Sequence, residues 1–157
     1  MQITLRPVAR SEFDLVSRVQ VEPDQVRFSG TVAQAFEDDE DGVDFHAILA
    51  RGEVIGFFKI DRLYHETYSF ARADELGLRA FMIDRCQQGR GYATAAVAAL
   101  ATYLPGQYPD RSALLLTVNF QNPAAIRCYL KGGFEDSGGI HPHGIAGPQH
   151  ILRMKLS

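Results

Sequence analysis

The stretch that decides the fold of this chain is Phe81-Met82-Ile83-Asp84-Arg85-Cys86-Gln87-Gln88-Gly89-Arg90-Gly91-Tyr92-Ala93. An apolar strand ends at Asp84, a polar loop with two glycines follows, and an alanine-rich helix begins almost at once. The first N–H groups of a helix have no partner inside it, and the helix dipole adds partial positive charge there. Gly89 and Gly91 lack a Cβ, so an anion can approach the backbone, and Arg90 adds a charged donor. The stretch therefore predicts a pyrophosphate-binding loop between a strand and a helix.

A glycine loop is also found in other kinds of structure. A tight turn without a ligand is the simplest alternative. A P-loop requires Gly-Lys-Ser/Thr at its end, and a dinucleotide fold requires a third glycine where Thr94 stands. Too little chain follows to complete a doubly wound sheet. An acyl-CoA site fits better, because it needs one pyrophosphate cradle beside an open strand edge.

Composition narrows the class of protein. The chain has 157 residues, of which 46% are apolar and 22% are charged, and this predicts a single globular domain over residues 1–157. The net charge is −3, and no Lys/Arg cluster points to nucleic acid. No apolar run is long enough to span a membrane, and the first residues show no signal pattern. Cys86 and Cys128 form no CxxC pair, so we expect a cytoplasmic protein.

The pattern along the chain predicts an α+β sheet domain. Alternating or continuous apolar runs predict strands over residues 3–8, 45–50, 54–62, 78–83, 112–118, 134–137 and 150–156. Helical spacing and caps predict helices after Ser11, over Thr31–Phe36, from the glycine loop to Pro105-Gly106, and from Pro123 to Gly132-Gly133. Residues 64–76 show no assignable pattern, and residues 138–149 read as a loop.

Two sequence motifs, which follow one another in the same order as in the family, make the chain similar to the GCN5-related N-acetyltransferase (GNAT) superfamily. The family's pattern Gln/Arg-x-x-Gly-x-Gly/Ala occurs as Gln88-Gly89-Arg90-Gly91-Tyr92-Ala93. About 30 residues later come Asn122, Ala125, Tyr129 and Gly133-Phe134, which resemble the family's second signature. The resemblance covers most of the chain, and residues 77–138 best. It implies an α+β fold with a mixed, mostly antiparallel sheet of six to seven strands flanked by about four helices.

Within the superfamily, residues 81–92 look most like the diamine and spermine/spermidine acetyltransferases. Leu116-Thr117 is similar to that subgroup's Leu-Ser, whereas Gly147-Pro148-Gln149-His150 departs from its acidic ending. Protein N-terminal acetyltransferases of the family often carry Glu where Thr117 stands. The acceptor therefore remains open between a polyamine, another small amine, an amino acid and a peptide amine.

The resemblance implies direct transfer of the acetyl group of acetyl-CoA to a primary amine, without a metal. The loop N–H groups would hold the pyrophosphate, and the edge of residues 81–83 would pair with pantetheine like an added strand. An N–H near Met82 or Ile83 would stabilise an oxyanion. The residues so implied in cofactor binding are Phe81, Met82, Ile83, Gln88, Gly89, Arg90, Gly91, Tyr92, Ala93, Thr94 and Asn122.

Two of the implied residues have structural alternatives. Asn122 contacts the cofactor arm, caps a helix, or does both. Tyr129 is the implied catalytic acid, which would give its proton to the departing thiolate, and its alternative role is a core aromatic residue.

The proton acceptor and the acidic stretch are left open by the sequence. An alkylammonium has no lone pair, so a base or a water chain must take its proton. Candidates for the base are Asp84, Glu75, Asp74, Glu66 and His65. Residues 37–44 hold six carboxylates in eight positions, which form either a solvated loop or an electrostatic funnel for a polycationic amine. His141, His143 and His150 fit no standard metal spacing and read as loop histidines.

The leading functional hypothesis is thus an amine N-acetyltransferase acting on a small molecule, with a polyamine as one candidate acceptor. A peptide or amino-acid acetyltransferase is the nearest alternative. A CoA-binding sensor without turnover and a nucleotide-binding module are hypotheses from other classes. We expect no nucleic-acid or membrane partner, and a homodimer is possible.

Overall fold

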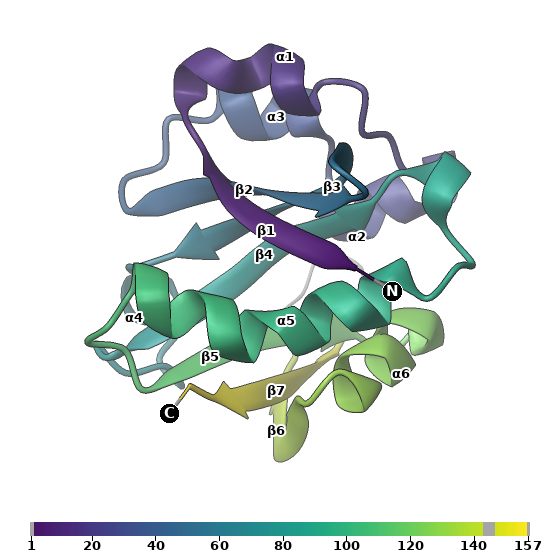
Figure 1. The fold of residues 1–157 in the computed structure, drawn as a ribbon. Coiled ribbons are helices and arrows are strands. Elements are labelled where there is room, and N and C mark those ends of the chain that lie inside the picture. Colours follow the sequence, from purple (N-terminus) through teal and green to yellow (C-terminus); the bar gives the residue numbers. More distant parts are fainter. Residues whose placement is uncertain (1, 143–146, 157) are drawn as a thin grey trace.

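One mixed seven-stranded sheet carries the fold (Figure 1). The computed structural model describes residues 2–142 and 147–156. The strand order is β1-β2-β3-β4-β5-β7-β6, and only the β4–β5 pair is parallel. The strands are β1 (Ile3–Val8), β2 (Val43–Ala50), β3 (Glu53–Asp61), β4 (Glu75–Ile83), β5 (Ala113–Asn119), β6 (Glu135–His141) and β7 (Gln149–Lys155). The expected α+β fold with a mostly antiparallel sheet of six to seven strands is confirmed.

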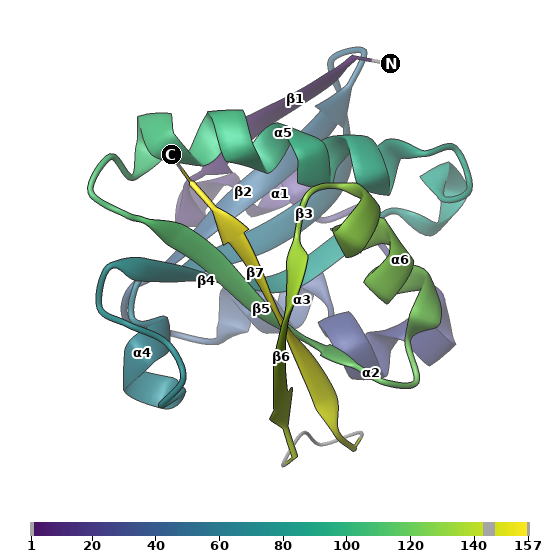
Figure 2. The same ribbon diagram turned by 90° about the horizontal axis from the view of Figure 1, so that it is seen from below.

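Helices cover both faces of this sheet. The α-helices are α1 (Phe13–Val16), α2 (Val26–Ser29), α3 (Val32–Glu37), α4 (Tyr64–Thr67), α5 (Tyr92–Gln107) and α6 (Pro123–Lys131). The short 3-10 helices are η1 (Arg10–Glu12), η2 (Pro23–Gln25) and η3 (Arg85–Gln87). Helix α5 runs along one face beside α6, while α1 and α3 lie over the opposite face of β2 and β3 (Figures 1 and 2). No helix in the described residues is long and apolar enough to cross a bilayer.

The core is divided by the sheet. The largest cluster lies between the sheet and α5, which buries Ala96, Val97, Leu100 and Leu104. A second cluster packs Val16, Val32 and Ala35 against the other face of the first strands. A third, smaller cluster surrounds the fully buried Tyr64 of α4 and includes residues of β5 and β7. Small alanines let α5 approach the sheet closely, so the helix N-terminus is held firmly beside the end of β4.

The helix expected after Ser11 is short and ends at Val16, well before Pro23. Three other sequence-based boundaries differ from the structure. Helix α5 continues through Pro105 to Gln107, because a proline in the last turn forfeits only one intrahelical hydrogen bond, and the Tyr108 N–H still donates to the Leu104 carbonyl at 2.7 Å. Strand β6 extends to His141 through an irregularity between Asp136 and Ile140. The remainder of the expected loop includes residues 143–146, which lie outside the described residues.

The third difference concerns residues 64–76, which form α4, a turn and the start of β4. The ring of Tyr64 lies directly on Gly77, where an added Cβ would overlap it. This aromatic packing holds α4 against the sheet, and it leaves no periodic signal in so short a segment.

Candidate active site

The central feature of the site is a split between β4 and β5. These parallel strands pair only from Glu75–Gly77 to Ala113–Leu115, and they separate beyond that point. On its other side, β4 pairs with β3 through an irregularity near Ala80, whose φ is +53°. The bulge bends the strand away from β5. One edge of residues 78–83 is therefore left without a strand partner among the described residues.

A cavity of about 760 Å³ opens at this split. Its wall contains eleven of the twelve site residues expected from the sequence, and Arg90 is the exception, since it is exposed and lies outside the lining. The eleven are Phe81, Met82, Ile83, Gln88, Gly89, Gly91, Tyr92, Ala93, Thr94, Asn122 and Tyr129. Residues about 50 positions apart in sequence thus meet around one cavity.

The loop after β4 presents a row of free backbone donors. Gly89 and Gly91 have φ values of +78° and +81°, in the left-handed region that favours glycine. Gly91 is the N-cap of α5. None of the N–H groups from Gln88 to Thr94 donates a hydrogen bond within the described part of the chain. A Cβ added at Gly89 would meet no atom within 4 Å, so the space above it is open. This geometry suits an anion such as a pyrophosphate.

Beside this loop, the backbone N–H groups at the end of β4 point alternately toward β3 and toward the open edge of the strand. The Asp84 N–H donates to the Ile55 carbonyl of β3 at 2.7 Å. Since successive residues of a strand point their N–H groups to opposite edges, Met82 faces β3 as well, and Ile83 faces the open edge. Of the two N–H groups expected to face a thioester, the one on Ile83 therefore has the suitable direction. The Ile83 carbonyl accepts from the Gln88 side chain at 2.9 Å.

Helix α6 contributes Asn122 and Tyr129 to the opposite wall. Asn122 is the N-cap, and its Oδ1 accepts from the Ala125 N–H at 3.4 Å, so the capping role is present. The ring of Tyr129 packs edge-on against Phe81 and Phe134, at centroid distances of 5.9 and 5.6 Å. Burial raises the pKa of the Tyr129 phenol well above its usual value. A phenol in this state keeps its proton until a strong base forms beside it.

The five carboxylate and histidine candidates for the base do not line this cavity. Asp84 accepts from the Gln20 and Cys86 N–H groups, and Glu75 accepts from the Arg72 N–H and from Arg153. The structure instead brings other polar and aromatic side chains to the wall. Among them are Arg27, Phe28, Lys59, Tyr64, Tyr68, Arg79, Thr117, Asn119 and His141.

Strand alternation could have identified part of this second group. Leu78, Leu116 and Val118 lie in the cluster under α5, so their neighbours Arg79, Thr117 and Asn119 belong to the opposite face. For Tyr64, Tyr68 and His141 there was no such signal, because they lie in segments without a regular pattern.

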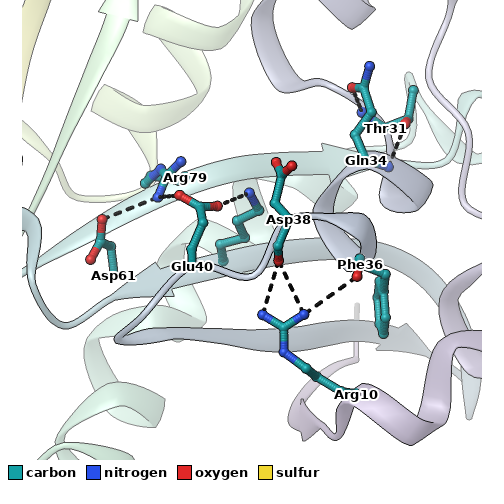
Figure 3. A network of polar contacts seen from close by, with 9 residues as sticks. Arg10, Thr31, Gln34, Phe36, Asp38, Glu40, Asp61 and Arg79 are labelled. Carbon is teal, nitrogen blue, oxygen red and sulfur yellow. Dashed lines mark hydrogen bonds and ion pairs between the residues drawn. The ribbon is translucent and has the colours of Figure 1, made fainter.

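The acidic stretch is tied into ion pairs next to the cavity (Figure 3). Glu40 pairs with Lys59 at 2.9 Å through one oxygen and with Arg79 at 2.8 Å through the other. Arg79 also pairs with Asp61 at 3.2 Å. Burial opposes ionisation of Glu40, but the hydrogen bonds from Lys59 and Arg79 outweigh it and lower the Glu40 pKa. None of the six carboxylates lines the cavity.

The described residues contain no cluster of three or more His, Cys, Asp or Glu that could hold a metal ion. The site thus consists of a backbone anion cradle, an open strand edge and an aromatic and polar pocket. This combination defines an acyl-CoA-binding transferase fold.

Comparison with known proteins gives the family. The sequence profile of the acetyltransferase (GNAT) family matches residues 11–134, and the chain belongs to this family. The uncharacterized N-acetyltransferase YbbJ of Bacillus subtilis (strain 168) is 29% identical over 85 residues, which are 54% of this chain and 53% of YbbJ. The match thus spans about half the length of this curated relative.

Solved structures of similar fold include two kinds of N-acetyltransferase. AAC(6')-Ib in complex with paromomycin and acetyl-CoA has a TM-score of 0.78 at 22% identity, covering 99% of this chain and 94% of that one. A point mutant of the SpeG spermidine N-acetyltransferase from Vibrio cholerae has a TM-score of 0.68 at 17% identity, covering 99% and 95%. At these identities the likeness establishes the fold.

Proposed function

We propose that this protein transfers the acetyl group of acetyl-CoA to the primary amine of a small molecule. The observation that carries the proposal is the row of unpaired N–H groups from Gln88 to Thr94, which opens on the same cavity as the unpaired edge of β4. Acetyl-CoA supplies an activated thioester, and the chain supplies binding, orientation and proton transfer.

Binding of the donor begins at the loop. The N–H groups and the N-terminal end of the α5 dipole favour the pyrophosphate. Arg90 is exposed at the loop, where its long side chain can add a charge-assisted contact from the solvent side. The edge at Ile83 offers a hydrogen-bond donor to the amide-rich pantetheine or to the thioester carbonyl. A preorganised N–H at such a carbonyl contributes about 3–4 kcal/mol in other acyl transfers.

Tyr129 is the group that we assign to protonate the departing thiolate. It lines the cavity, and its phenol is protonated at neutral pH. Burial raises its pKa and makes it a weaker acid, so transfer to the thiolate depends on close positioning of the two groups. Its ring contacts with Phe81 and Phe134 fix the direction of the hydroxyl. A positioned general acid contributes a rate factor of about 10²–10⁴.

His141 is the group that we assign to take the proton of the amine. It lies at the end of β6, in contact with the Tyr68 ring at a centroid distance of 5.3 Å. It is the one histidine among the described residues that line the cavity, whose wall contains no carboxylate. Histidine is the side chain that serves most often as a general base in enzymes.

The test is thiol release from acetyl-CoA with a panel of polyamines, aminoglycosides, amino acids and peptides. We expect turnover with a small amine, and we expect Tyr129→Phe to lower kcat about 100-fold with little change in the KM for acetyl-CoA. Tyr103→Phe, outside the cavity, serves as the matched control. Acetyl-CoA binding without thiol release across the whole panel would instead identify a CoA-binding sensor.

A further inference from the structure

We propose that the acceptor carries an anionic group, most simply a carboxylate close to its amine, bound by Arg79, Asn119 and Arg27. The inference rests on the proposed acetyl transfer and adds the chemical class of the acceptor. It comes from the charges in the cavity wall, from one buried amide without a partner among the described residues, and from the contacts through Gln121 that join Arg27 and Asn119.

The charge of the wall is positive. Among the described residues, the wall holds the cationic side chains of Arg27, Lys59 and Arg79 and no carboxylate. Behind it, Glu40 and Asp61 neutralise part of this charge. Three cations thus face two carboxylates, and one positive charge remains. An ammonium group of a polyamine would meet no carboxylate here, whereas an anion would be attracted.

Arg79 retains an unused edge of its guanidinium. Both of its ion pairs, to Glu40 and to Asp61, are made through Nη1 (Figure 3). Its Nε and Nη2 atoms donate no hydrogen bond to another described residue. A guanidinium edge of this kind matches the two oxygens of a carboxylate. The two carboxylates behind Arg79 hold the side chain in place without occupying that edge.

Asn119 points more directly to a ligand. It is only 3% exposed and lines the cavity at the end of β5. Its Oδ1 accepts from the Gln121 N–H at 2.7 Å, which fixes the orientation of the amide. Its Nδ2 has no hydrogen-bond partner among the described residues. An unpaired buried donor is costly, so the arrangement is explained if an acceptor oxygen of the ligand binds there.

The three residues line the same cavity. Arg79 and Asn119 lie on the face of β4 and β5 that is turned away from α5. Arg27 of α2 donates to the Gln121 side chain at 3.4 Å, and the N–H of the same Gln121 donates to Asn119. Arg27 makes no ion pair within the described residues. Donors from three segments thus line the cavity in which we place the carboxylate.

Matched acceptor pairs that differ by one anionic group test this inference. Each amino acid is compared with its decarboxylated amine, as in tyrosine with tyramine, histidine with histamine and lysine with cadaverine. Phosphoethanolamine with ethanolamine tests phosphate in place of carboxylate, and spermidine represents polycations. We expect kcat/KM, measured by thiol release, to be at least about tenfold higher for the anionic member of the pairs that react.

Three variants locate the effect. Asn119→Asp keeps the side-chain acceptor for Gln121 but replaces the free donor by an anion, so it should lower kcat/KM for the anionic acceptor at least about tenfold and spare the decarboxylated amine. Arg27→Ala, at an exposed position, should lower the same preference about threefold or more. Arg127→Ala, an exposed arginine of α6 outside the cavity wall, should leave it unchanged.

The outcomes separate this inference from the proposed function. Equal or better turnover of the decarboxylated amines or of spermidine would overturn the anionic acceptor and leave acetyl transfer intact. An unchanged preference in Asn119→Asp and Arg27→Ala would overturn the assigned residues. If acetyl-CoA binds and no amine of the panel reacts, the proposed transferase activity itself is wrong.

Discussion

The side chain of Gln88 donates a hydrogen bond to the main-chain carbonyl of Ile83 at 2.9 Å. This contact joins the glycine loop to the last residue of β4. Gln88 also exchanges two hydrogen bonds with Gln25, at 3.0 and 3.1 Å. The first residue of the family's loop pattern is therefore a structural tie that holds the N–H cradle at a fixed distance from the open strand edge.

Replacing Gln88 by alanine should consequently weaken binding of acetyl-CoA. The loss of side-chain hydrogen bonds, each with a net contribution of about 0.5–1.5 kcal/mol, predicts a three- to tenfold increase in the dissociation constant. Calorimetry with acetyl-CoA measures this change. Gln107→Ala, at the other end of α5, is the control and should bind normally. Equal affinities of the Gln88→Ala variant and the wild type would show that the tie is dispensable.

Gly89 and Gly52 form a matched pair for testing the cradle. Both have a φ of +78°, and an added Cβ would have no atom within 4 Å in either case. Alanine should therefore introduce similar backbone strain, about 1–2 kcal/mol, at both positions. Only Gly89→Ala places a methyl group at the anion cradle. We expect similar losses of thermal stability and a weaker acetyl-CoA complex only for Gly89→Ala; equally normal binding by both variants would contradict the cradle.

The sequence predicted most of the strands, helices α5 and α6, and a set of residues that line one cavity. These parts depend on local signals: apolar runs, glycines with a special backbone conformation, and a capped helix after Asn122. Gly89, Asn122 and Tyr129 line one cavity. The two family motifs that contain these residues had predicted that they belong to one site.

The acceptor side could not be predicted in the same way. Its residues come from α2, α4, β5 and the end of β6, and they meet only through tertiary packing. Tyr64 reaches the wall because Gly77 leaves room for its ring. The acidic stretch suggested a funnel for cations. In the structure, Glu40 instead lies between Lys59 and Arg79. These two residues are neighbours because β3 pairs with β4, and sequence spacing does not reveal that pairing.

Glu40 should therefore matter for stability. Lys59 is 6% exposed, and Glu40 is its partner in the only ion pair that it makes among the described residues. Glu40→Gln would leave a buried ammonium without its counterion, and we expect a loss of about 2 kcal/mol, because Glu40 itself is only partly buried. Urea unfolding at pH 7 measures this loss. Asp39→Asn, an exposed neighbour, should cost little. A variant of normal stability that binds cationic amines more weakly would support the funnel instead.

A second polar network lies outside the cavity wall and surrounds His46, which is 1% exposed. Its Nδ1 lies 2.6 Å from the Tyr103 hydroxyl, and its Nε2 lies 2.9 Å from the Tyr108 hydroxyl. Tyr108 donates its own proton to Asp44 at 2.7 Å, so it must accept from His46. The proton of the neutral imidazole is thereby assigned to Nε2, and Nδ1 accepts from Tyr103. Both ring nitrogens of the neutral imidazole are therefore hydrogen-bonded, and the cost of charging this histidine comes from its burial.

This network predicts how stability depends on pH. Burial lowers the pKa of His46 to about 4, with Asp44 opposing, while an unfolded histidine has a pKa of about 6.5. Between these two pH values the imidazole binds a proton in the unfolded chain but not in the folded one. The contribution of His46 to the free energy of unfolding is therefore complete above pH 6.5. It is lost as the pH falls to 4, and the total loss is about 3 kcal/mol. Urea unfolding of the wild type and of His46→Gln, at several pH values across this range, measures this loss. The carboxylates titrate in both proteins, so the difference between the two pH profiles belongs to the histidine. The wild type should lose more stability than the variant on acidification, because only its native state must resist protonation of a buried imidazole. Parallel pH profiles would mean that His46 is protonated inside the fold without disturbing its two tyrosine partners.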